Sequence, residues 1–99
     1  MALAANTLKQ CGGGQVVVED RKVSGLVELP VAGLMSEKPA GVVSEQLVSV
    51  LDGFKRCGCD LNNPNMQLSL LALVVIPALR ISDKGLVDVT NFRFLAVLE

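Results

Sequence analysis

A run of apolar residues that ends at a proline is the feature that most limits how this chain folds. Leu68–Ile76 contains a single polar residue, Ser69, and Pro77 follows directly. Proline lacks the backbone N–H and its ring clashes with the preceding turn, so a regular helix does not continue through it. A polar turn sequence, Ser82–Gly85, comes soon afterwards. This order predicts a buried element, a forced break, a short strand, a turn and a second strand.

The composition is unusually apolar for so short a chain. Hydrophobic residues account for 51% of the 99 residues before the nine glycines are added, whereas an average protein reaches about 45–50% with glycine included. Charged residues make up only 19%. A small domain has the most surface to cover with polar groups, so the apolar excess predicts a surface that another domain or subunit covers. A tight core of Val and Leu in an ordinary monomer is the alternative.

Charge and aromatic content argue against several classes of function. The net charge is −1 without a basic block, and three Phe are the only aromatic residues, which does not fit nucleic-acid binding. The apolar run is shorter than the roughly 20 residues of a membrane span. The N-terminus lacks the charged start and long apolar stretch of a signal peptide. We therefore expect a cytoplasmic protein with no nucleic-acid partner and no membrane partner.

The cysteines do not predict a disulfide framework or a metal site. Cys11, Cys57 and Cys59 are odd in number, unlike the cysteines of small secreted domains. Cys57 and Cys59 could hold a soft metal, but a closed zinc site needs four ligands and the chain has no His. The simpler interpretation is three reduced thiols. The sequence thus predicts no metal ligand and no cofactor within this chain.

Catalytic groups are equally hard to find. Nucleophilic Ser or Cys usually relies on a His base, which is missing here. Ser82 and Lys84 form a possible pair, but their spacing is that of a solvated turn. The carboxylates of Glu19, Asp20, Asp83 and Asp88 fall at predicted turns or on exposed strand faces, where solvation is the simpler role. The sequence predicts no catalytic residue.

The overall pattern predicts an α+β fold in a single small domain, residues 1–99, with antiparallel β-hairpins packed against two or three helices. Its most regular signal is an apolar stripe with helical spacing, beginning at Val43 and ending at Phe54. Ser36 is the predicted N-cap of this helix and Gly58 its stop. The other predicted elements are a helix over Ala2–Gln10, a hairpin of Gln15–Glu19 with Val23–Leu29, a short and mostly buried helix over Met66–Leu73 (or a buried strand), a hairpin of Leu79–Ile81 with Leu86–Val89, and a last strand over Phe92–Val97.

The glycine triplet Gly12–Gly14 resembles a phosphate-binding loop only superficially. Such loops lie between a strand and the start of a helix, whereas this triplet lies between a predicted helix and a predicted strand. A helix stop followed by a close backbone approach is the favoured interpretation.

Three blocks of the chain resemble, in order, the C-terminal domain of the adenine deaminase family. The blocks are Ala4-Ala5-Asn6 followed by Gly12–Val18, the segment Leu29–Ser36, and Cys57–Cys59 followed by Pro64–Val89. Two positions depart from the family pattern, Asn65 for a common Phe and Val74 for a frequent Pro. Together the blocks span nearly the whole chain.

The resemblance implies a part of a larger amidohydrolase. Members of this family hydrolyse adenine to hypoxanthine and ammonia in a (β/α)₈ barrel, where His, Glu and Asp hold a divalent metal, Mn or Fe, that activates water. None of those ligands maps onto this chain. We therefore expect a C-terminal domain or fragment that is itself non-catalytic and packs on the barrel of the parent enzyme, or supports subunit association. A free-standing binding or oligomerisation module is the alternative.

One loop is the predicted interdomain contact. It comprises Gly33, Leu34, Met35 and Ser36, because Met adapts to varied surfaces and exposed apolar loops need a cover. An ordinary turn leading into a helix is the alternative interpretation.

Overall fold

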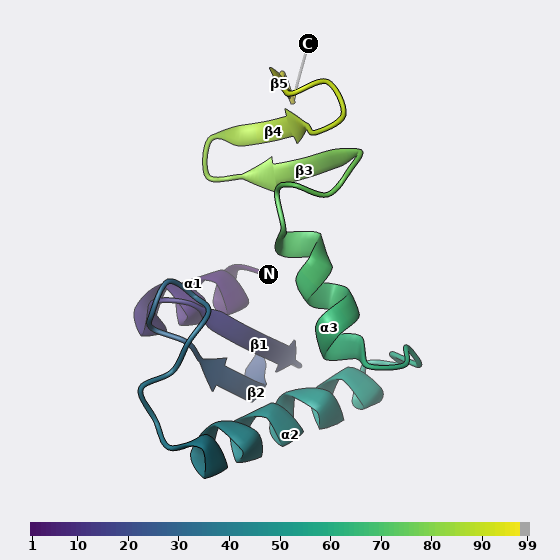
Figure 1. The fold of residues 1–99 in the computed structure, drawn as a ribbon. Helices are drawn as coiled ribbons and strands as arrows, with labels where there is room; N and C mark the ends of the chain where they lie inside the picture. Colours follow the sequence, from purple (N-terminus) through teal and green to yellow (C-terminus); the bar gives the residue numbers. More distant parts are fainter. Residues whose placement is uncertain (98–99) are drawn as a thin grey trace. The chain divides into compact units, whose positions relative to one another are not determined.

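A computed structural model describes residues 1–97. These residues form two compact units, Met1–Asp60 and the part from Leu61 onward, and each unit is described by itself. Helices and two antiparallel sheets together confirm the predicted α+β class (Figure 1). The prediction that residues 1–99 form a single domain includes two residues outside the described range, and it stays a prediction.

The first unit begins with helix α1 (Ala2–Cys11) and a β-hairpin, β1 (Gly14–Glu19) and β2 (Lys22–Glu28). The strands pair antiparallel, as predicted, with a bulge between Val17 and Val18. Both turn residues, Asp20 and Arg21, have positive φ, 46° and 62°. This is the backbone of a tight hairpin turn whose twist matches that of the strands.

The glycine triplet ends α1 and starts β1. Gly12 adopts the left-handed conformation, with φ 79°, and the Gly13 N–H donates to the Leu8 carbonyl at 2.9 Å. A Cβ on Gly14 would lie 2.0 Å from the Val27 oxygen on the neighbouring strand. The predicted roles, a helix stop and a close backbone approach, are therefore confirmed.

Helix α2 (Ala40–Arg56) runs alongside the hairpin (Figure 1) and packs mainly against β2. Its start was wrongly predicted: Pro39, not Ser36, is the N-cap. A proline disfavours helical backbone in the residue before it, so the helix begins only after Pro39. The Ser36 Oγ instead accepts a hydrogen bond from the Lys38 N–H at 3.2 Å.

Helix α2 ends at Arg56, and Gly58 beyond it is the predicted stop. Gly58 has φ 82°, and its N–H donates to the Lys55 carbonyl at 3.0 Å. The Cys59 N–H donates to the Phe54 carbonyl at 3.0 Å. These two bonds form a Schellman motif, which satisfies carbonyls that the helix itself leaves free.

The core of the first unit lies between α2 and one face of the hairpin. Val17, Val27 and Val50 are buried, and four half-buried side chains pack against them: Leu29, Val43, Leu47 and Phe54. The apolar stripe predicted for α2 therefore faces the core. Glycines allow the close approach, because a Cβ on Gly25 would lie 2.7 Å from the Ser49 oxygen.

The second unit contains α3 (Pro64–Ser69), a single 3₁₀ turn η1 (Leu70–Ala72), and a sheet in the order β3-β4-β5. The strands are β3 (Leu79–Ser82), β4 (Gly85–Asp88) and β5 (Arg93–Leu95), which confirms the predicted hairpin and last strand. Asp83 and Lys84 form the turn, and the Ser82 Oγ accepts from the Lys84 N–H at 3.1 Å. The polar turn after Pro77 is therefore as predicted.

The helix predicted over Met66–Leu73 is present but exposed, so its predicted burial is wrong. Met66, Leu70, Leu71 and Leu73 are all exposed. Among the described residues of this unit, only Asp88 and Val89 are buried. These residues therefore provide no hydrophobic core against which the helix could pack. Across residues 1–97, no helix combines the length and apolar character needed to cross a bilayer.

Candidate interdomain contact

The predicted contact loop is a tight turn that projects two large apolar side chains. Val31 and Met35 pair across the turn, with the Val31 N–H donating to the Met35 carbonyl at 3.1 Å and the Met35 N–H to the Val31 carbonyl at 3.2 Å. Ala32 and Gly33 between them have positive φ, 55° and 72°. Leu34 and Met35 keep 76% and 61% of their surface exposed. The turn thus holds an apolar tip in solvent.

The glycine triplet lies in close contact with this turn. A Cβ on Gly13 would lie 2.6 Å from the Gly33 Cα, and the Leu29 N–H donates to the Gly13 carbonyl at 3.0 Å. Only a glycine at position 13 permits this approach. Two segments that are distant in sequence therefore pack closely together beside the exposed tip.

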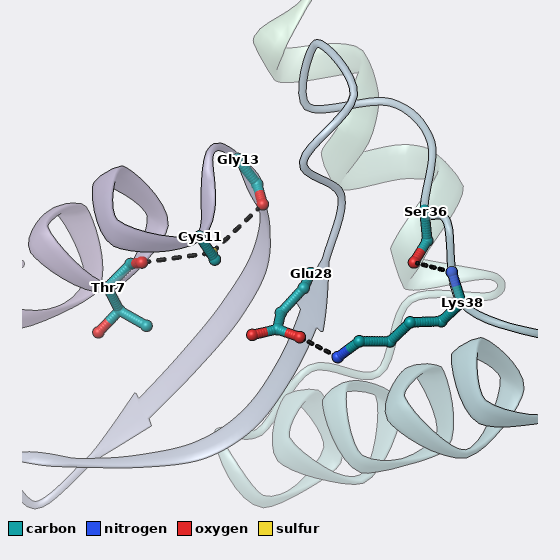
Figure 2. Close-up of polar contacts among 6 residues, drawn as sticks. All are labelled: Thr7, Cys11, Gly13, Glu28, Ser36 and Lys38. Atoms are coloured by element: carbon teal, nitrogen blue, oxygen red, sulfur yellow. Dashed lines mark hydrogen bonds and ion pairs between the residues drawn. The ribbon is translucent and has the colours of Figure 1, made fainter.

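Polar contacts hold the segment between this turn and α2 in place (Figure 2). Lys38 forms an ion pair with Glu28 at the end of β2. The hydrogen bond and charge of Lys38 hold the pKa of the Glu28 carboxyl below its usual value. The Cys11 thiol, half-buried nearby, donates to the Thr7 carbonyl at 3.2 Å and to the Gly13 carbonyl at 3.4 Å. These groups border a small hollow of about 230 Å³.

A shallow, open apolar groove of about 530 Å³ lies between the turn and α2. Its lining is mostly aliphatic, with Leu34 and Met35 from the turn and Val43 and Leu47 from α2. Ser36, Lys38 and Ser44 supply its polar border. A groove of this kind can receive an apolar side chain from another surface, but it offers little chemistry for a reaction.

Two of the carboxylates considered in the sequence, Glu19 and Asp88, bind neighbouring side chains and therefore have structural roles. The Glu19 carboxylate pairs with the Arg56 guanidinium at 2.9 Å, and this hydrogen bond holds the pKa of Glu19 below its usual value. Asp88 was expected on an exposed strand face, but it is 7% exposed. Asn91 in the following turn and Arg93 on the neighbouring strand β5 bind the Asp88 carboxylate, which explains why the prediction was wrong.

Asp88 holds the turn between β4 and β5. Its Oδ1 accepts from the Asn91 N–H at 3.1 Å, and its Oδ2 accepts from the Asn91 Nδ2 at 2.8 Å and the Arg93 Nε at 3.2 Å. Hydrogen bonds from Asn91 and then Arg93 hold the pKa of Asp88 below its usual value. The available sequence signal was Asp88 near the end of a predicted strand and before Thr90-Asn91, since Asp is favoured at the first position of a turn.

Within residues 1–97 no three His, Cys, Asp or Glu side chains gather closely enough to hold a metal ion. Cys57 and Cys59 are free thiols beyond the end of α2, and Cys11 is a free thiol at the end of α1. Ser82 is the last residue of β3 and Lys84 lies in the β3–β4 turn, and the serine hydroxyl donates to the Gly85 carbonyl at 3.0 Å. The groove and the turn beside it are the features of the first unit that suit contact with another surface.

Comparison with known proteins places this chain in a family. The family model described as the adenine deaminase C-terminal domain matches residues 1–93, which confirms the resemblance seen in the sequence. Adenine deaminase of Roseobacter denitrificans is 56% identical over the whole chain, adenine deaminase 3 of Rhizobium meliloti 54% over 99% of it, and adenine deaminase of Clostridium botulinum 48% over 98%. The chain spans only 16% of the length of each relative. No solved structure matches.

Proposed function

Because this chain belongs to the adenine deaminase C-terminal domain family, we propose that it acts as the non-catalytic C-terminal part of an adenine deaminase. It packs against the catalytic portion of that enzyme or supports the association of its subunits. The parent reaction is the hydrolysis of adenine to hypoxanthine and ammonia. We also propose that the protein is located in the cytoplasm.

The observation that carries this proposal is the extent of the match. The chain aligns from end to end with enzymes named adenine deaminase, yet it covers only 16% of their length. More than four-fifths of each relative therefore lies outside the matched part. A free-standing binding or oligomerisation module is less well supported, because the relatives that match are long enzymes.

The metal of the family does not fit the residues of this chain. Divalent Mn or Fe would need several His, Asp or Glu ligands, but the chain has no His. The described residues offer no cluster of three potential ligands. We therefore assign the metal, and the activation of water, to the catalytic portion, and we derive no chemical step from this chain.

The first unit offers a surface suited to such packing. The turn at Gly33–Ser36 presents Leu34 and Met35 beside the apolar groove. Apolar groups that are held rigidly in solvent gain free energy when a partner covers them. We propose that these four residues contact the catalytic portion.

A chimeric enzyme tests the proposal. The part of the Roseobacter denitrificans adenine deaminase that matches this chain is replaced by the 99 residues, and adenine turnover is compared with that of the natural enzyme. We expect activity within about tenfold of the natural enzyme, since the two segments are 56% identical. The same enzyme truncated before the matched part is the control, and we expect it to lose activity or stability.

The isolated chain provides the complementary test. Purified alone, it should hydrolyse no adenine when Mn²⁺ or Fe²⁺ is added. Turnover by the isolated chain would show that the non-catalytic assignment is wrong. Full activity and stability of the truncated enzyme would show that the supporting role is wrong.

A further inference from the structure

The second unit leaves its most apolar segment uncovered. Leu70–Leu79 contains no polar side chain over ten consecutive residues. Leu71 and Val75 in this segment are 64% and 73% exposed. Soluble monomers rarely expose contiguous apolar surface of this kind, and where they do it usually marks an interaction site.

Strand β3 extends the same apolar character onto a sheet. Alternate residues of a strand point to one face, so Leu79 and Ile81 share a face, and Ile81 is 80% exposed. The register pairs Ile81 with Leu86 on β4, and Leu86 with Leu95 on β5. One face of this small sheet therefore carries aliphatic side chains from all three strands, next to the Asp88–Arg93 ion pair, which the register places on the same face.

The unit does not compensate for this exposure with a core of its own. Val89 is its only buried hydrophobic residue within the part of the chain that the structure describes. A piece of fewer than about 40 residues rarely folds stably without additional support, because it buries too little apolar surface. The exposed segment is thus the natural place for that support.

We propose that Leu70–Leu79 together with Ile81 on β3, which we call the apolar strip, docks against the catalytic portion of the parent enzyme. This inference rests on the proposed function and adds the surface through which it operates. The occupant follows from the relatives, in which more than four-fifths of the polypeptide lies outside the matched part. A partner in the same polypeptide is present at high effective concentration and can cover the strip permanently.

The chemistry of the strip agrees with that occupant. Leu70–Leu79 carries no charged side chain, and Arg80 is the only charged residue between Leu70 and Ile81, so a phosphate-rich or strongly charged partner finds little to pair with. Permanent interfaces resemble a domain core cut in half, with mostly apolar contacts. The matching surface on the catalytic portion is therefore aliphatic.

Amide hydrogen exchange in the isolated chain and in the chimera tests the docking surface. We expect the Leu70–Ile81 amides to exchange rapidly in the isolated chain and at least tenfold more slowly in the chimera. The isolated chain should also enhance the fluorescence of a hydrophobic dye such as anilinonaphthalene sulfonate. Both measurements use the wild-type chain, so they do not depend on the folding of any variant.

Substitutions in the strip complete the test. A variant with Leu71→Ser, Val75→Ser and Ile81→Ser should reduce dye binding by the isolated chain and lower the temperature at which the chimera inactivates. Val48→Ser is the control, because Val48 is also apolar and 54% exposed but lies on α2 in the first unit. The control should leave both measurements unchanged.

The outcomes separate the two proposals. An inactive chimera that carries the wild-type chain would overturn the proposed function. An active chimera with unchanged exchange at Leu70–Ile81, or with equal effects of the strip variant and Val48→Ser, would overturn the docking surface alone. Protection of these amides in the isolated chain that grows with its concentration would identify a second copy as the occupant and would also overturn this inference.

Discussion

At the scale of single residues, two glycines determine how closely α2 approaches the hairpin. A Cβ on Gly25 would meet the Ser49 oxygen at 2.7 Å, and a Cβ on Gly53 would meet the Val17 Cγ1 at 2.9 Å. The first contact is with backbone, which cannot rotate away as a side chain can. Neither the sequence nor the helical stripe revealed these contacts, because they depend on how two elements pack rather than on local pattern.

Gly25→Ala should therefore destabilise the first unit by about 1–3 kcal/mol, since overpacking forces the backbone of α2 to move. Gly41→Ala is the matched control, because a Cβ there has no atom within 4 Å and alanine favours helix. We expect the control to leave stability unchanged or slightly increased. Urea unfolding followed by circular dichroism measures both, and equal midpoints for the two variants would contradict the packing described for Gly25.

Asp88 provides a residue-scale prediction about pH. Hydrogen bonds from Asn91 and Arg93 lower the pKa of its folded-state carboxyl. The stabilisation is therefore complete above the unfolded-state pKa of about 3.9 and is lost as the pH falls through the lower folded-state pKa. Asp88→Asn should lower the protection of the Asn91 amide at pH 6, and the difference from wild type should shrink as the pH falls below about 4. Equal protection in both proteins at pH 6 would contradict this role.

At the scale of elements, the sequence pattern predicted correctly those features of a helix that depend on a short segment alone. The stripe from Val43 to Phe54 predicted the buried face of α2, and Gly58 predicted its end, because helical periodicity and left-handed backbone are properties of short segments. The start of α2 was missed because Pro39 restricts the residue before it more strongly than Ser36 favours a cap. The burial of Met66–Leu73 was missed because burial depends on what lies outside the segment.

The β1–β2 turn gives a prediction at this scale. Arg21 adopts φ 62°, a conformation that costs a non-glycine residue some strain, and Asp-Gly is a favoured pair for such turns. Arg21→Gly should therefore stabilise the hairpin by several tenths of a kcal/mol, with part of the gain offset by the extra freedom of the unfolded chain. Thermal unfolding measures the change. A decrease in the melting temperature would contradict the turn type.

At the scale of the whole molecule, the two compact units differ in how far their apolar side chains are buried. The first unit has a core of Val17, Val27 and Val50 between helix and hairpin, whereas the second exposes most of its large apolar side chains. The apolar excess of the composition, which left a covered surface and a tight core as alternatives, is concentrated in the second unit and in the turn at Gly33–Ser36. The exposure of Leu34 and Met35 agrees with the loop predicted from the sequence, whereas its contact with another domain stays a prediction. The apolar strip could not be predicted, because the pattern that creates it is equally typical of a buried core.

Binding of the isolated chain to the truncated Roseobacter denitrificans enzyme tests the central claim most directly. Calorimetric titration of the two proteins at several temperatures should give a one-to-one complex with a negative heat-capacity change, because apolar surface leaves water on binding. Adenine turnover by the truncated enzyme should rise as the complex forms. A folded truncated enzyme that neither binds the chain nor gains activity from it would contradict the account.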